Sequence, residues 1–148
     1  MLKSQSASIL AFLDDFAGSG QTFKDSIGVW SGAFSTTVVP LFTTIVMCPE
    51  AIPVVREAGA EAIYSVLHPD TERFKSIFTD EDFAILSSYA LELHSKTPLG
   101  HKKMGCMTVL SRNSNNNMPF LLRGTKGQRV WYGLFPRHDQ LHPLPYER

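Results

Sequence analysis

Two different periods of apolar and polar residues alternate along the first seventy positions. Short, continuous apolar runs, typical of strands that are covered on both faces, occupy residues 8–13, 41–48 and 62–67. Between them the pattern becomes helical at residues 21–34 and 50–58. This alternation predicts a βαβαβ unit with right-handed crossovers and a parallel sheet, in which the first strand is central. The fold class is therefore α/β, with a partial Rossmann-like sheet.

After Pro69 the pattern changes to helices alone. A short helix is expected over residues 71–78, and Thr79 followed by three acidic residues is typical of the start of a longer helix that ends near His94. These two helices would form a helical insertion over residues 71–95.

The last third of the chain is richer in glycine, proline and asparagine. It predicts a C-terminal β-hairpin, with strands at residues 104–110 and 118–122 and a turn at 115–117, followed by an irregular tail. We expect one domain over residues 1–148, with a core at 1–70 and the hairpin and tail at 96–148.

The composition is that of a soluble globular protein, with 43% hydrophobic and 19% charged residues. Fourteen basic side chains balance fourteen acidic ones, so the net charge attracts neither nucleic acid nor a membrane, and a bound anion must be held locally. Cys48 and Cys106 lie in apolar stretches and are expected to be buried free thiols. No signal peptide is recognisable, so we expect a cytoplasmic protein without a membrane partner.

The segment from Asp14 to Thr22 carries the clearest chemistry. Gly18 and Gly20 permit a tight turn at the start of a helix, where backbone amides and the helix dipole favour a phosphate. The predicted phosphate-binding residues are Gly18, Ser19, Gly20, Gln21 and Thr22. The hydroxyls of Ser19 and Thr22 add hydrogen-bond donors to the backbone amides.

Asp14 and Asp15 stand just before that turn, at the expected end of the first strand. Adjacent carboxylates suit the vicinal hydroxyls of a sugar, directly or through a divalent cation. Each feature alone is weak, since paired acids often cap a helix and a G-x-G turn is common. A nucleotide-binding Walker loop is disfavoured because no lysine follows Gly20, and a dinucleotide fingerprint lacks its third glycine.

The stretch AFLDDFAGSGQT, residues 11–22, resembles the signature of type I phosphoribosyltransferases. By that resemblance Asp14 and Asp15 would hold the ribose hydroxyls of phosphoribosyl pyrophosphate (PRPP), and Gly18 to Thr22 would hold its 5-phosphate. Mg²⁺ would be the cofactor, reached by the two acids indirectly through the ribose hydroxyls.

A narrower resemblance extends towards the C-terminus. DDFAGSG, the later NNNMPFL at residues 115–121 and WYGLFPR at 131–137 together resemble PRTase-CE, a phosphoribosyltransferase-like domain of prokaryotic conflict systems, some of which accompany retrons. The two later motifs are also typical of a turn and an aromatic strand that pack on the core. Arg137 is a candidate for a bidentate phosphate contact.

Type I enzymes carry further strands before the signature, with a pyrophosphate loop and a hood, whereas only about seven residues precede the strand here. The resemblance therefore implies the C-terminal portion of such a domain, in a split or truncated enzyme. We expect a partner chain or self-association to supply the rest, and an isolated chain that is inactive unless complemented. A non-catalytic sensor of phosphorylated ribose and a loop that only caps a helix remain as alternatives.

Two polar clusters are better explained as solvent-exposed surface than as functional sites. His138, Asp139 and His142 could bind a metal, but prolines interrupt the segment, which favours a surface tail. Lys102 and Lys103 beside His101 form a basic patch of a kind that is more often solvated than functional.

Overall fold

The computed structural model describes residues 9–30, 32, 38–93, 96–110, 113–124, 131 and 133–135. The chain divides into two compact units, Met1–Pro69 and Asp70–Arg148.

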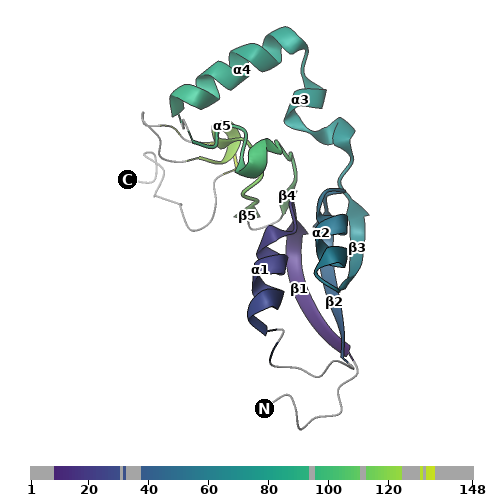
Figure 1. Cartoon of the computed structure of the whole chain (residues 1–148). Helices are drawn as coiled ribbons and strands as arrows, with labels where there is room; N and C mark the ends of the chain where they lie inside the picture. The colour runs from purple at the N-terminus through teal and green to yellow at the C-terminus, as the bar shows by residue number, and fades with distance from the viewer. Residues whose placement is uncertain are drawn as a thin grey trace, which may run out of the picture. The chain divides into compact units, whose positions relative to one another are not determined.

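The first unit is a parallel sheet with two helices, and it confirms the predicted α/β class (Figure 1). Its strands follow one another in the order β1-β2-β3, and the helices connect them. The bounds of its elements in chain order are β1 (Ile9–Ala17), α1 (Gln21–Trp30), β2 (Val39–Met47), α2 (Ala51–Glu57) and β3 (Glu61–Leu67).

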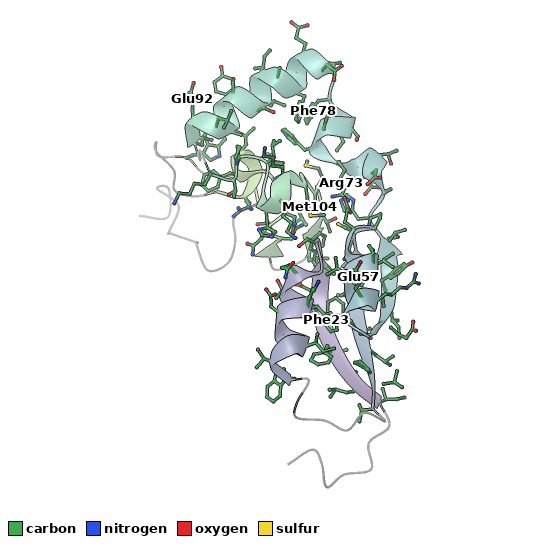
Figure 2. All side chains as sticks on the ribbon, in the orientation of Figure 1. Phe23, Glu57, Arg73, Phe78, Glu92 and Met104 are labelled. Atoms are coloured by element: carbon green, nitrogen blue, oxygen red, sulfur yellow. The ribbon has the colours of Figure 1, made fainter. Side chains whose placement is uncertain are left out.

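A single apolar cluster joins both helices to the same face of the sheet. Phe23 of α1 stacks on Phe42 of β2 with 4.4 Å between ring centroids, and meets the edge of Phe12 of β1 at 5.3 Å. Ala51 and Val55 of α2 are fully buried in the same cluster. Figure 2 labels Phe23 where α1 lies against the strands. The first turn of α1 and the start of α2 are thereby fixed relative to the strand ends.

The expectation that β1 is central and covered on both faces is wrong for the described residues. The central strand is β2, and the sheet face opposite the helices leaves Leu13 80% exposed and Ile45 52% exposed. A short apolar run predicts a strand but does not reveal its neighbours, because the periodicity is the same for an edge strand and a central one.

The second unit begins with helices, as predicted. A 3-10 turn, η2 (Asp70–Glu72), precedes α3 (Phe74–Ile77) and the longer α4 (Asp80–Leu93). Thr79 caps α4 as expected, because its hydroxyl accepts a hydrogen bond from the Asp82 amide at 3.2 Å. No described helix has the length and apolar character required to cross a lipid bilayer.

The hairpin forms, but at a different place from the one predicted. After η3 (His101–Lys103), β4 (Val109–Leu110) pairs antiparallel with β5 (Asn113–Ser114). The strand expected at residues 118–122 is wrong, because the chain there forms α5 (Phe120–Arg123). The Phe120 amide donates to the Pro98 carbonyl at 2.9 Å, a contact distant in sequence that the local apolar pattern does not reveal.

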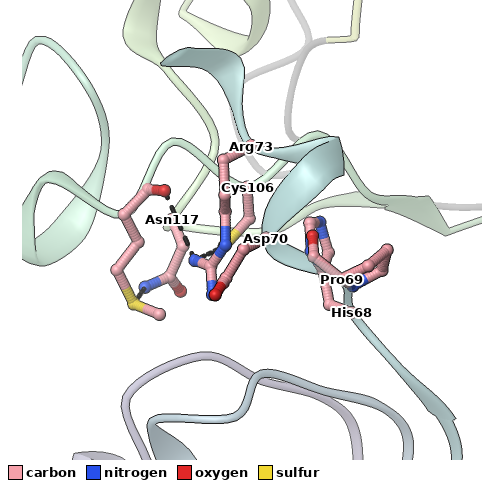
Figure 3. Close-up of polar contacts among 7 residues, drawn as sticks. His68, Pro69, Asp70, Arg73, Cys106 and Asn117 are labelled. Atoms are coloured by element: carbon pink, nitrogen blue, oxygen red, sulfur yellow. Dashed lines mark hydrogen bonds and ion pairs between the residues drawn. The ribbon is translucent and has the colours of Figure 1, made fainter. Parts of the chain in front are cut away.

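A buried arginine connects the helical part of the second unit to its loops. The guanidinium Nη1 of Arg73 donates to Cys106 Sγ at 3.0 Å and to the Met104 carbonyl at 3.3 Å, and its Nη2 lies 3.5 Å from exposed Asp70 (Figure 3). Cys48 and Cys106 are both buried free thiols, which confirms the prediction from the sequence.

Candidate functional site

The predicted phosphate-binding segment leads directly from the first strand into the first helix. The strand continues past Leu13, where the apolar run suggested its end, so that Asp14 and Asp15 belong to β1 and pairing ends at Ala17. The carbonyl of Ala17 accepts a hydrogen bond from the Cys48 amide at 2.8 Å. The bend of residues 18–20 follows, and α1 begins at Gln21.

Gly20 makes the turn into α1 possible. Its φ of +71° lies in the left-handed region, which side chains with a Cβ rarely adopt. A Cβ at this position would lie 3.1 Å from the Ala51 carbonyl oxygen and 3.1 Å from the Val54 Cβ. Its carbonyl accepts the first helical hydrogen bond, from the Lys24 amide at 3.0 Å. The turn therefore packs closely against α2 and needs glycine for two independent reasons.

The turn leaves its hydrogen-bond donors available. Among the described residues, no acceptor contacts the amides of residues 18–22 or the hydroxyls of Ser19 and Thr22. The Gln21 amide group instead donates to Asp25 at 2.7 Å, along the helix surface. Free amides at the start of a ten-residue helix, with the positive end of its dipole, form a favourable environment for an anion.

The two acids form an interacting pair beside this turn. The Asp15 amide donates to Asp14 Oδ1 at 2.8 Å. Partial burial raises the pKa of Asp14 above its usual value of 3.8, and the neighbouring Asp15 carboxylate raises it further, while the amide hydrogen bond opposes both. The charged form of Asp14 is therefore less stable than that of an ordinary aspartate, and a nearby cation or hydroxyl donors would stabilise it.

The register of the sheet adds a residue that the sequence did not single out. Asp14 pairs with Thr44 of β2, which in turn pairs with Tyr64 of β3, so the three side chains share one row on the helix-covered face. Thr44 is 3% exposed, and its hydroxyl has no partner among the described residues. A buried hydroxyl without a partner is unfavourable, which makes Thr44 a candidate ligand contact.

A second such residue follows β3. His68 is buried, its amide donates to the Met47 carbonyl at 2.8 Å, and its Nδ1 lies 3.0 Å from the Pro69 carbonyl. In the described part of the chain its Nε2 has no partner. Ligands of open parallel sheets bind at the carboxyl ends of the strands, and only the pairing of the strands places Thr44 and His68 there.

The carboxylates suit a magnesium ion that is also held by a ligand. The described residues contain no group of three or more histidine, cysteine or acidic side chains that could hold a metal by themselves. Mg²⁺ commonly binds one or two carboxylates and completes its shell with water and substrate phosphates. Asp14 and Asp15 could serve as such carboxylates.

The asparagine motif contributes structure to the second unit. Asn115 Nδ2 donates to the Thr108 carbonyl at 2.7 Å, and its Oδ1 accepts from the Asn117 amide at 2.9 Å. The Asn117 side-chain amide reaches Met104 Sδ (Figure 3). These contacts support the reading of the motif as a turn.

The other candidates of the C-terminal tail, Arg137, His138, Asp139 and His142, lie outside the described residues.

Comparison with known protein families gives a match over most of the chain. The model of the PRTase-CE family matches residues 3–137, which is most of the chain. No curated protein and no solved structure matches.

Proposed function

This chain belongs to the PRTase-CE family, and on that premise we propose that it binds the ribose 5-phosphate group of PRPP, or of a related ligand, at the turn between β1 and α1. The phosphate would lie against Gly18, Ser19, Gly20, Gln21 and Thr22, and the ribose hydroxyls against Asp14 and Asp15.

One observation carries this proposal. A glycine turn with free amides opens α1, and two interacting carboxylates precede it by three residues on the same strand. A ribose 5-phosphate carries a vicinal diol and a phosphate on one sugar, so a single ligand offers a group to the carboxylates and another to the amides. The chain's zero net charge supports the same reading, because the anion must then be held by directed amides.

The protein's own groups would bind and orient the sugar. Asp14 and Asp15 accept hydrogen bonds from the vicinal hydroxyls, and the amides of the turn fix the phosphate, so the anomeric carbon is held in one orientation. The Thr44 hydroxyl supplies a further contact in the row of Asp14. Mg²⁺, when bound, would neutralise the pyrophosphate leaving group.

Calorimetric titration tests the proposal. We expect ribose 5-phosphate, and PRPP with Mg²⁺, to bind the wild-type chain, and Asp15→Asn to weaken both by about tenfold to a hundredfold, because a charge-assisted hydrogen bond contributes about 1.5–3 kcal/mol. Glu57→Gln removes the same charge from an exposed position on α2 and is the matched control. Equal isotherms for Asp15→Asn and the wild type would count decisively against the site.

We further propose that the chain acts as part of a split or truncated phosphoribosyltransferase in a prokaryotic conflict system, a proposal supported by the family alone. Pyrophosphate release from PRPP should then require the product of a neighbouring gene that supplies a pyrophosphate loop. Ligand binding without release under any such combination would favour a sensor of phosphorylated ribose.

A further inference from the structure

The zero net charge of the chain conceals a strong segregation along the sequence. Residues 1–92 contain twelve of the fourteen acidic residues, whereas residues 93–138, called here the basic segment, contain none. The basic segment holds eight of the fourteen lysines and arginines, which are Lys96, Lys102, Lys103, Arg112, Arg123, Lys126, Arg129 and Arg137. Separation of charge between parts of one chain is typical of proteins that bind polyanions.

The described cations of the basic segment are exposed, with one exception. Lys96, Lys102 and Lys103 are exposed, and among the described residues none of them forms an ion pair with a carboxylate. Arg123 is the exception, because it is buried and its Nε donates to the Met118 carbonyl at 3.0 Å. The exposed lysines therefore have no acidic partner in the part of the chain that the structure describes.

The backbone at Lys102 and Lys103 is unusual. Both residues are left-handed, with φ of +52° and +58°, in the turn η3. Backbone hydrogen bonds hold the turn, including one from the Lys103 amide to the Gly100 carbonyl at 3.1 Å and one from the His101 amide to the Asn116 carbonyl at 2.9 Å. Glycine or asparagine would fit these conformations with less strain. The presence of two consecutive lysines in this strained backbone is explained if their positive charges are needed to bind a ligand.

We infer that the basic segment binds single-stranded nucleic acid through its phosphate backbone. A phosphate chain presents closely spaced negative charges over many nucleotides, and the described lysines of the segment are exposed cations that can meet them. Arg112, Lys126, Arg129 and Arg137 lie outside the described residues and enter the argument by their charge alone. Aromatic residues occur among these cations, and Phe135 leaves 40% of its surface exposed, as a base-stacking side chain requires. The inference does not depend on the sugar-phosphate site, because none of the residues from Asp14 to Thr22 belongs to the basic segment.

Fluorescence anisotropy with a labelled single-stranded oligonucleotide of about 20 nucleotides tests the inference. The full chain should bind it with an affinity that falls steeply as salt rises from about 50 to 200 mM. In Lys102→Asn/Lys103→Asn the log–log salt slope should fall by about 1.4, and affinity at the lowest salt should drop by about tenfold or more. Asparagine tolerates the left-handed backbone, so the variant should melt no lower than the wild type.

The matched control removes two positive charges elsewhere. Arg56→Gln/Lys75→Gln changes exposed cations outside the basic segment and should leave the salt slope unchanged. Equal slopes for the two double variants, or no binding by the wild type, would overturn the inference.

Three further arms decide the identity of the partner. A duplex of the same sequence should bind less tightly than the single strand, and tighter duplex binding would refute a single-stranded partner. Sedimentation with anionic phosphatidylglycerol vesicles, in the absence of oligonucleotide binding, would indicate a membrane surface instead. Displacement of the oligonucleotide by millimolar ribose 5-phosphate would place binding at the β1–α1 turn and also overturn the inference.

Discussion

Replacing Gly20 by alanine tests the geometry of the turn on which the proposed site depends. The substitution adds one methyl group at a residue with φ of +71°, between the first strand and the first helix. That methyl group would lie 3.1 Å from both the Ala51 carbonyl oxygen and the Val54 Cβ, so α2 must move by a few tenths of an ångström to accept it.

Three terms determine the magnitude. Placing a Cβ in the left-handed region costs about 1–2 kcal/mol, and overpacking against α2 adds about 1 kcal/mol. Reduced entropy of the unfolded chain returns about 0.5–1 kcal/mol. The free energy of unfolding of Gly20→Ala should therefore fall by roughly 1–3 kcal/mol. Displacement of the turn should also weaken ribose 5-phosphate binding.

Gly28→Ala is the matched control, because it makes the same chemical change within α1. A Cβ at Gly28 meets nothing within 4 Å, and its φ is not left-handed. Alanine in a helix interior is favoured over glycine, so this variant should gain about 0.5–1 kcal/mol. Urea unfolding followed by circular dichroism measures both changes as shifts in midpoint at constant slope. If Gly20→Ala proves as stable as Gly28→Ala, the turn does not have the described conformation and the amide cradle is refuted.

Three further predictions concern individual side chains. Thr44→Val should raise the free energy of unfolding by about 1 kcal/mol, because it removes a buried hydroxyl without a partner, and calorimetry should show weaker ribose 5-phosphate binding. Because the folded chain holds a proton on Asp14 above the usual pKa of 3.8, wild-type stability should fall as pH rises through that raised pKa, and Asp14→Asn should lessen the fall in melting curves taken at several pH values. Arg73→Met should cost about 1–3 kcal/mol in urea unfolding through lost buried hydrogen bonds, whereas Asp70→Asn should cost less than about 1 kcal/mol because Asp70 is exposed.

The strands and helices of the first unit could be predicted because their apolar periods are regular. The end of β1 could not, since Asp14 and Asp15 end the apolar run while backbone pairing continues to Ala17. The segment at residues 118–122 is short and apolar, which suits a strand and a buried helix equally. The structure has a helix there, in which the Gly124 amide donates to the Phe120 carbonyl at 2.8 Å.

The sequence likewise reveals one part of the candidate site and not the other. Its glycines and acids are contiguous in sequence and could be recognised there. Thr44 belongs to β2 and His68 follows β3, and only the pairing of the strands places them at the same end as Asp14. An isolated threonine or histidine carries no local signal for such a position.

The order of the strands also has a consequence for biosynthesis. Each strand pairs with the one made just before it, thirty positions apart for β1 and β2 (Ile9 with Val39) and twenty for β2 and β3 (Leu41 with Glu61). No described segment after β3 pairs with this sheet, and domains fold as units while a nascent chain emerges. Residues 1–69 can therefore begin to fold as they emerge from the ribosome, while the basic segment is still being translated.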